Sequence, residues 1–383
     1  MSADSPLLAE CRALQRAVSA HPTIAALEAD PGWPSLSARL DTLLGAVRRH
    51  EPPREPAPPR EPRRVRLAQW NIEHGNWYPQ VERALLEHPD LYAADVITID
   101  EIDLGCARAG NRDVTGDLAR ALGLHGVWAP LFLETTIGRD DDPACAAGRE
   151  NEEGLFGIAV LSRWPLGEVR LVELPSPREL QFELERMVGR HAALAVEVLR
   201  PGAPFVAVAA HLEVHRTRAH RAAQMRRIVD ALAGERRPVV IAGDFNTHTF
   251  DRGLWHSALH GASALLLLPA PLLRARLTRP DRGPAREPLF AELRRGGFEW
   301  APYVDFAPTL QLRDDRLEEL HALPWAIRVP ARSVLEWAVH RGTLRLDWIC
   351  ARGWSSGRGW TVRGLDGRGR ASDHAPIVAE LRD

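Results

Sequence analysis

The pattern of hydrophobic residues changes along the chain, and the change predicts a small helical segment followed by a larger layered domain. Apolar residues recur at helical spacing between Leu8 and Val18, and the same spacing returns between Ser35 and Val47. This spacing places apolar side chains on one face of a helix, so residues 1–50 are predicted to form a helical N-terminal appendage. Docking, dimerisation or no separate role would each suit such a segment, and packing against the main domain is the role we expect.

A proline-rich linker separates this appendage from the rest of the chain. Residues 51–62 read EPPREPAPPREP, and proline fixes its own backbone torsion and removes a hydrogen-bond donor. From Arg63 onward, short apolar runs alternate with helical stretches such as Asp117–Leu122 and His220–Leu232. The runs that we predict to be strands lie at residues 65–70, 96–99, 158–161, 192–198, 205–210, 239–242, 345–351 and 375–381.

This alternation predicts an α/β domain over residues 63–383, with sheets that are covered by other layers. Residues 251–341 differ from the rest, because they hold several helical patches, many prolines and little strand signal. We therefore predict a helical insertion at about 251–341, ahead of the closing strands.

Polar residues gather where the predicted strands end. Loops at strand ends are held by a rigid sheet, and they suit active-site residues for that reason. Each of these residues alone also fits a turn or a helix cap, but their shared position beside apolar strands favours a common site. The residues concerned are Asn71, Asp100, Glu101, His211, Asp244, Asn246, Asp347, Asp373 and His374.

The chemistry of these residues fits the hydrolysis of a phosphate ester. A hard cation such as Mg²⁺ prefers carboxylate oxygens and keeps several waters, and Glu101 and Asp373 can supply the carboxylates. Asn71 suits a phosphate oxygen or a metal-bound water. A histidine can move a proton near neutral pH, and a carboxylate beside it fixes its tautomer and favours its charged form. Asp347 and His374 are candidates for such a pair.

Six motifs in this region resemble those of one known family. They follow the order of the endonuclease/exonuclease/phosphatase superfamily, and GDFN and SDH are strongly specific when they occur together. The resemblance implies a DNase I-like fold, a four-layered α/β sandwich of two packed β-sheets flanked by helices, with the site at one end. The motifs are QWNIE (69–73), DEID (100–103), AAHLEVH (209–215), AGDFNT (242–247), RLDWI (345–349) and SDHAPI (372–377).

The resemblance also implies roles for the residues around a metal ion. Glu101 matches the metal-binding glutamate of the family, Asn71 matches the asparagine beside it, and Asp373 matches a further acid of the metal site. Asp244 and Asn246 match the pair that orients the attacking water and the phosphate. The implied cofactor is Mg²⁺ or Mn²⁺.

Further matches concern proton transfer and phosphate contacts. His374 matches the catalytic histidine of the family, and Asp347 matches the carboxylate that supports it. His211 matches a histidine that contacts the phosphate and can protonate the leaving group. Outside the motifs, Asn111 and Arg112 are substrate-binding candidates in a polar loop, where Arg112 could clamp a phosphate with two hydrogen bonds. A solvated surface loop is an equally good interpretation of these two residues.

Three departures from the family pattern bear on the substrate. Asp100 stands where the family often has glutamine, which adds negative charge beside the metal. Phe156 and Ile158 stand where related sequences often carry histidine and asparagine, so one polar substrate contact is expected to be lost. The abasic-site nucleases of the superfamily use a tyrosine between the residues that match Glu101 and Asp244, and this chain has none there.

Composition narrows the remaining possibilities. The formal net charge is -2 and the pI is about 6.7, which argues against a surface made for bulk nucleic-acid binding. The basic residues are all arginine, so a P-loop lysine and a lysine Schiff base are excluded. The 4 cysteines are far apart and form no zinc or disulfide pattern. No signal segment or membrane-spanning apolar stretch is present, so we expect a cytoplasmic protein without stable membrane insertion.

The predicted function is that of a metal-dependent hydrolase acting on a phosphodiester or phosphomonoester. The substrate classes that fit are a small molecule, a lipid head group and a nucleic acid, while protein partners stay unknown. A DNA or RNA endonuclease or exonuclease of the same superfamily is the first alternative. A non-catalytic interaction module on the same fold is the second, and it ranks lower because the full set of site residues is present together.

Overall fold

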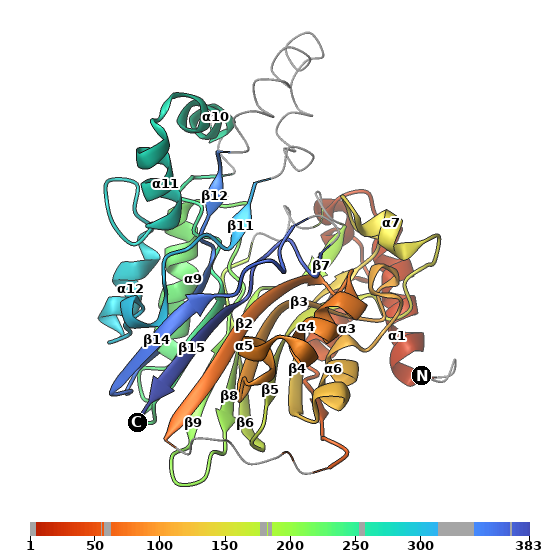
Figure 1. Cartoon of the computed structure of the whole chain (residues 1–383). Helices are drawn as coiled ribbons and strands as arrows, with labels where there is room; N and C mark the ends of the chain where they lie inside the picture. Colours follow the sequence, from red (N-terminus) through yellow and green to blue (C-terminus); the bar gives the residue numbers. More distant parts are fainter. Residues whose placement is uncertain are drawn as a thin grey trace.

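Two β-sheets form the centre of the molecule, as the computed structural model shows (Figure 1). The structure describes residues 5–54, 56, 63–176, 182, 186–252, 257–312, 341–367 and 370–383. The strands of the first sheet are β1 (Arg48–His50), β2 (Arg64–His74), β3 (Val96–Leu104), β4 (His125–Glu134), β5 (Leu155–Ser162), β7 (Met187–Gly189), β14 (Ser356–Thr361) and β15 (Ile377–Arg382). The strands of the second sheet are β6 (Leu166–Glu173), β8 (Ala192–Val198), β9 (Phe205–Ala209), β10 (Val239–Asp244) and β13 (Asp347–Arg352).

The strand order brings distant parts of the chain together. The first sheet runs β1-β4-β5-β3-β2-β15-β14, with β7 also paired to β4, and the second runs β13-β10-β9-β8-β6. A separate pair, β11 (Leu310–Gln311) and β12 (Thr343–Leu344), forms a small third sheet. Each of the predicted strands overlaps an observed strand, so these predictions are confirmed.

A continuous apolar core fills the space between the two sheets. Every residue of β5 and of β9 is buried, which explains why their sequences are apolar runs rather than an alternation of apolar and polar residues. Val160 of β5 and Leu194 of β8 are fully buried in this central cluster. Burial of apolar surface on this scale is the main source of stability of such a domain.

Helices cover the outer face of each sheet and make two further apolar layers. One layer joins the first sheet to the N-terminal helices, α4 and α6, and the other joins the second sheet to α9 and α12. The molecule is therefore an α/β sandwich of four layers, which confirms the predicted fold class. The helices are α1 (Pro6–Ser19), α2 (Ile24–Glu28), α3 (Trp33–Leu44), α4 (Tyr78–Glu87), α5 (Pro89–Tyr92), α6 (Val114–Leu122), α7 (Asp142–Ala146), α9 (Arg218–Ala231), α10 (Ser257–Leu267), α11 (Ala270–Thr278) and α12 (Leu289–Arg295), with 3₁₀ turns η1 (Ala107–Ala109) and η2 (Ala301–Tyr303).

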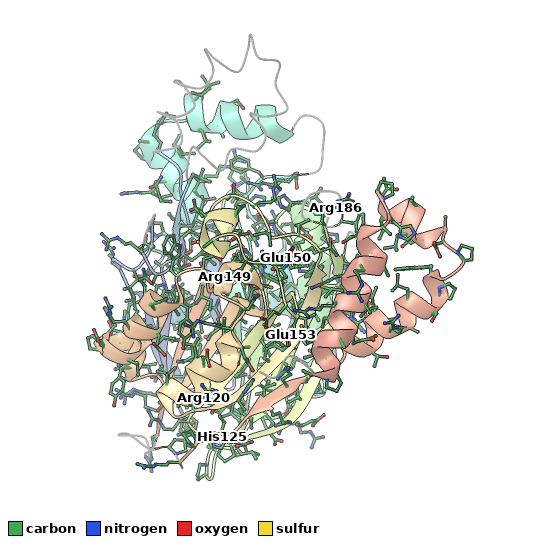
Figure 2. The ribbon with its side chains drawn as sticks, turned by 90° about the vertical axis from the view of Figure 1, so that its right-hand side faces the viewer. Arg120, His125, Arg149, Glu150, Glu153 and Arg186 are labelled. Carbon is green, nitrogen blue, oxygen red and sulfur yellow. The ribbon has the colours of Figure 1, made fainter. Side chains whose placement is uncertain are left out.

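The N-terminal helices pack on the main domain and lead directly into its first sheet. After α3 the chain forms β1, which pairs antiparallel with β4 and places Arg48 opposite Trp128. The Gln15 side chain donates a hydrogen bond of 3.0 Å to the Glu153 carbonyl, and Arg186 donates one of 2.7 Å to the carbonyl of Pro22. Figure 2 shows Glu153 and Arg186 beside these helices. Residues 55 and 57–62 of the predicted linker lie outside the described residues.

The predicted insertion falls into two parts in the structure. Helices α10 and α11 form a small apolar cluster with Leu344 and Leu346 next to the third sheet, whereas α12 packs on α9 over the second sheet. A fully buried ion pair of 2.7 Å between Arg221 of α9 and Glu287 holds the segment before α12. Residues 253–256 and 313–340 of the insertion lie outside the described residues.

Membrane-spanning helices were also sought. Across the described ranges, every helix is too short or too polar to cross a bilayer.

Candidate active site

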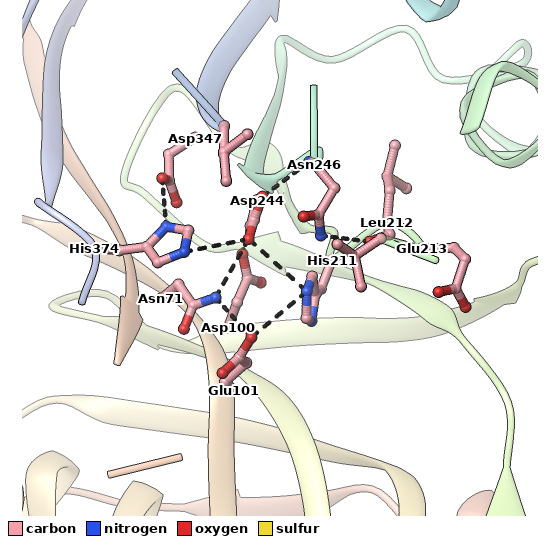
Figure 3. Close-up of polar contacts among 12 residues, drawn as sticks. Asn71, Asp100, Glu101, His211, Leu212, Glu213, Asp244, Asn246, Asp347 and His374 are labelled. Atoms are coloured by element: carbon pink, nitrogen blue, oxygen red, sulfur yellow. Dashed lines mark hydrogen bonds and ion pairs between the residues drawn. The ribbon is translucent and has the colours of Figure 1, made fainter. Parts of the chain in front are cut away.

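Strands of both sheets end close together, and Figure 3 shows there the predicted site residues Asn71, Glu101, His211, Asp244, Asn246, Asp347 and His374. Asn71 lies on β2 and Glu101 on β3, two parallel neighbours in which Asn71 pairs with Asp100. Asp244 ends β10 and faces Asp347, the first residue of β13, in an antiparallel register. His211 follows β9 and His374 precedes β15. The topology thus brings together residues that are far apart in the sequence. Ser372 Oγ, for example, donates a hydrogen bond to the carbonyl of Asn71, which lies 301 positions away.

The backbone is strained where these residues are presented. Positive φ angles of 48°, 65°, 50° and 50° occur at Glu73, His74, Glu101 and Asn246, all of them residues with a Cβ atom. The register of β2 with β3 shifts between Asn71 and His74, and that of β3 with β5 shifts between Ile99 and Ile102. Such residues each cost about 1–3 kcal/mol and concentrate at functional sites. The strained backbone at these strand ends directs the polar side chains toward the site.

Glu101 and Asp244 form the acidic centre of the site. Asn71 Nδ2 donates hydrogen bonds of 2.9 Å to Glu101 Oε1 and 3.3 Å to Asp244 Oδ2, so it joins the two carboxylates. His211 Nε2 lies 3.7 Å from the same oxygen of Glu101 and 3.9 Å from Asp244 Oδ2. Ligand atoms of Glu101, His211 and Asp244 all lie within 4.8 Å of one another, which is close enough to hold a metal ion.

The electrostatics of the acidic centre suit a divalent cation. Burial raises the pKa of Glu101 well above its usual value, and the charge of Asp373 raises it further. Burial also raises the pKa of Asp244 to about 7, against the lowering effect of His374. Within the described part of the chain, the ion pairs of Glu101 and Asp244 are formed with histidines alone. A bound cation would relieve this repulsion, so the donor set fits a divalent metal ion.

His374 and Asp347 form the predicted histidine–carboxylate pair. His374 Nδ1 lies 2.8 Å from Asp347 Oδ2, and its Nε2 lies 3.8 Å from Asp244 Oδ2. Burial opposes protonation of His374, but the charges of Asp347 and Asp373 outweigh it and raise the pKa of His374 well above its usual value. The pair therefore presents a protonated imidazole to the acidic centre.

Asn246 and His211 line the neighbouring wall. Asn246 donates two hydrogen bonds of 2.8 Å. Its backbone N–H donates to Asp244 Oδ1, and its side-chain Nδ2 donates to the Leu212 carbonyl. Burial and the neighbouring His191 and His374 lower the pKa of His211 to about 3, so its imidazole is neutral near pH 7. A neutral imidazole offers a hydrogen-bond donor or a lone pair at Nε2.

Asp100 lies behind the acidic centre rather than in it. Its side chain is fully buried, and Oδ2 accepts hydrogen bonds of 2.6 Å from the Asp244 backbone and 2.8 Å from Gln69 Nε2. It therefore positions the backbone of a neighbouring acid. The second departure concerns Phe156, which lies against the site with its ring 5.4 Å from that of His74, and Ile158, which is buried in the central core.

The polar contacts of Asn111 and Arg112 join their loop to the Glu150 segment and to α6, and not to the acidic centre. Asn111 donates a 3.0 Å hydrogen bond to the Glu150 carbonyl, and Arg112 pairs with Asp117 at 3.3 Å. The Arg112 guanidinium also lies 4.6 Å from the centre of the Tyr78 ring. These contacts order the loop before α6, and the assignment of both residues to substrate binding stays a prediction.

Two groups at the site were missing from the sequence-based prediction. His74 Nε2 lies 3.6 Å from Glu101 Oε2, and His191 forms a buried 2.9 Å contact with Glu213 beside the ring of His211. The sequence places His191 directly before a predicted strand, which is no signal for an active-site residue. His74 directly follows the motif QWNIE, but an alternating strand would direct it away from the side of Asn71. Only a register shift brings it to Glu101.

The sequence from residue 68 to 374 matches the profile of the Endonuclease/Exonuclease/phosphatase family. The chain therefore belongs to this family, which includes nucleases and phosphatases, and the predicted resemblance is confirmed. A search of curated proteins finds no match.

Solved structures with a similar fold come from several organisms. An endonuclease/exonuclease/phosphatase from Beutenbergia cavernae is 20% identical with a TM-score of 0.47, and the match covers 84% of this chain and 72% of that one. The 3′ phosphatase NExo from Neisseria, bound to a product DNA hairpin, is 16% identical with a TM-score of 0.47, covering 83% and 100%. A family protein from Leptotrichia buccalis is 11% identical with a TM-score of 0.47, covering 83% and 100%.

Proposed function

We propose that the protein is a metal-dependent phosphoesterase, which hydrolyses a phosphodiester or phosphomonoester by in-line attack of water. The observation that carries this proposal is the pair of acids, the half-buried Glu101 and the buried Asp244, that lies beside the imidazole of His374. Buried charges of one sign are costly unless a counterion compensates them. A divalent cation and a phosphate group would together neutralise this centre.

Glu101, Asn71 and Asp373 would hold the cation, with Mg²⁺ or Mn²⁺ as the expected ion. When bound, such an ion polarises the phosphoryl group and stabilises the charge that develops on it. The hydrogen bond from Asn71 to both carboxylates fixes their positions before the ion binds. Preorganisation of this kind reduces the rearrangement needed during the reaction.

The other residues act on water and phosphate. Asp244, whose pKa is raised to about 7, is placed to orient the attacking water and accept its proton. His374 keeps its proton because Asp347 supports it, and it stabilises negative charge on the phosphate oxygens. Asn246 and the neutral His211 supply further contacts to these oxygens. Each role uses the protonation state that burial and neighbouring charges give the residue.

A phosphoester panel with and without Mg²⁺ or Mn²⁺ tests the proposal. It contains aryl phosphomonoesters and phosphodiesters, single- and double-stranded DNA, RNA and lipid phosphoesters. Metal-dependent turnover of one class is expected, with a loss of about 10³-fold or more in Asp244→Asn and His374→Ala, because each removes a group that acts in the reaction. Asp230→Asn and His125→Ala are the matched controls, because both side chains form their ion pairs with residues outside the acidic centre.

The outcomes separate the competing functions. Turnover that survives in both folded site variants would refute the site assignment. Turnover of DNA or RNA alone would identify a nuclease. If no substrate of the panel is hydrolysed and calorimetry detects no metal binding, the interaction module would be favoured.

A further inference from the structure

We propose that His74 is an imidazole ligand of the cation site at Glu101, and that it makes the site prefer a transition ion such as Mn²⁺ to Mg²⁺. The inference rests on the proposed function, because it specifies the metal site of that function. It concerns a residue outside the family motifs. The argument depends on the position of the imidazole, the backbone that holds it there and the chemistry of nitrogen ligands.

Two imidazoles flank the two oxygens of one carboxylate. His74 Nε2 lies 3.6 Å from Glu101 Oε2, and His211 Nε2 lies 3.7 Å from Glu101 Oε1. Both distances are too long for a hydrogen bond. Ligands bonded to one ion at about 2.1 Å lie roughly 3.0–3.4 Å apart, so small side-chain movements would let an ion join an imidazole to the carboxylate.

A strained stretch of backbone holds His74 in this place. Glu73, His74 and Gly75 have φ angles of 48°, 65° and 84°, and only glycine adopts this region freely. The turn is fixed by backbone hydrogen bonds of 3.0 Å from Gly75 to Ile72 and from Asn76 to Glu73. The residue that faces it, Glu101, is itself at a φ of 50°. Two strained residues from neighbouring strands therefore converge on one point, as is typical of ligand-binding sites.

The surroundings leave the His74 ring accessible but oriented. Its side chain is 22% exposed, so an ion from solvent can reach it. The Phe156 ring packs on one side with its centre 5.4 Å away, which limits rotation of the imidazole. On the far side of the turn, Asn76 Nδ2 donates a 2.7 Å hydrogen bond to Asp142 and anchors the segment to α7.

Nitrogen ligands discriminate between divalent ions. Mg²⁺ takes oxygen ligands and gives up its waters reluctantly, whereas imidazole suits the transition ions. The cation site proposed above, with Glu101, Asn71 and Asp373, takes oxygen ligands alone. An imidazole from His74 beside Glu101 Oε2 would add a nitrogen ligand to it. The set then favours Mn²⁺ or a later transition ion over Mg²⁺.

Calorimetric titration of the metal-free protein with MnCl₂ and MgCl₂ tests the inference without any substrate. The wild type is expected to bind Mn²⁺ about 10-fold or more tightly than Mg²⁺, and His74→Gln to lose about 10-fold in Mn²⁺ affinity with Mg²⁺ affinity within about 2-fold. His125→Gln is the matched control. His125 is the first residue of β4, and it lies away from the register shift between Pro130 and Phe132 in that strand. Pulsed electron paramagnetic resonance of bound Mn²⁺ supplies a second readout, in which ¹⁴N coupling from imidazole should fall in His74→Gln.

A second variant guards against misfolding. His74→Asn tolerates the positive φ at least as well as histidine, so its fold should be retained while the imidazole is lost. Unchanged Mn²⁺ affinity and unchanged ¹⁴N coupling in both variants would overturn the inference and leave His74 as a packing residue against Phe156.

The failures of the two proposals are distinguishable. Metal-dependent hydrolysis with no effect of His74 on Mn²⁺ binding supports the phosphoesterase and overturns the role of His74. Mn²⁺ binding that depends on His74, in a protein that hydrolyses no ester of the panel, supports the ligand and counts against the phosphoesterase.

Discussion

Two groups of acidic residues share strand β3, and they differ in the source of their positive charge. The Arg108 cluster consists of Arg108, Asp103, Glu134 and Asp142, in which the guanidinium contacts the three carboxylates at 2.8, 2.7 and 3.2 Å. The acidic centre of Glu101 and Asp244 has histidines at 3.6–3.9 Å as its ionic partners among the described residues.

The contrast teaches how to separate structural from functional acids. A guanidinium that is 3% exposed supplies a permanent cation and donates direct hydrogen bonds to all three carboxylates, so the Arg108 cluster needs no added cation. The acidic centre has longer contacts, and its ionic partners among the described residues are histidines, so it is completed only by an added cation. Composition alone does not distinguish the two groups, because both are rich in Asp and Glu.

Removing the internal cation should have the largest effect on stability. Arg108→Met leaves three buried carboxylates without their partner, and the free energy of unfolding should fall by about 3–5 kcal/mol. Denaturant unfolding measures the loss, and Arg120→Met is the control because Arg120 is 68% exposed on α6. A loss no larger than that of the control would mean that the Arg108 cluster is not closed by its guanidinium.

Adding an external cation should have the next largest effect, and only at the acidic centre. A metal ion at 100 times its dissociation constant should raise the free energy of unfolding by about 2.7 kcal/mol, and a chelator should reverse the gain. Glu101→Gln should abolish the gain, whereas Glu134→Gln, the same change in the Arg108 cluster, should keep it. Equal gains in the two variants would contradict the contrast drawn between the clusters.

The smallest expected effect is a pH dependence that belongs to the Arg108 cluster. Burial raises the pKa of Glu134 from its ordinary value of 4.5 to about 7, despite the opposing charge of Arg108. Between these pH values the folded protein keeps a proton that the unfolded chain has lost, so this contribution to stability falls as pH rises. These pKa values put the fall between pH 5 and pH 8 at no more than about 2.5 kcal/mol. Unfolding at pH 5 and pH 8 measures it, and a slope that persists in Glu134→Gln would assign it elsewhere.

Much of the fold and of the acidic centre was predictable from local sequence. The apolar runs that became β2, β3, β5 and β10 carry their signal in the residues themselves. Asp244, Asp347 and His374 follow or precede such runs, and their motifs placed them at strand ends that the structure brings together. The packing of two sheets into a four-layered sandwich came from the family resemblance. The strand order was not predicted, because strand pairing over hundreds of residues leaves no local pattern.

The parts that could not be predicted depend on irregular backbone and on burial. His74 reaches Glu101 through a register shift that breaks strand alternation, so a period of two misplaces its side chain. Asp100 was expected beside the metal, but its burial beneath the Asp244 backbone is a tertiary contact. The 3-residue strand β1 was too short to stand out within the predicted helical appendage.

The pairing of β1 with β4 has a consequence for the solubility of the chain. An uncovered sheet edge can pair with another molecule and begin aggregation. The outer edge of β4 is divided between β1, which covers Gly126–Trp128, and β7, which covers Phe132–Glu134. The N-terminal segment therefore protects part of the edge of the first sheet. A chain shortened to begin after residue 50 would expose the backbone hydrogen-bonding groups of β4, and these could pair with another molecule.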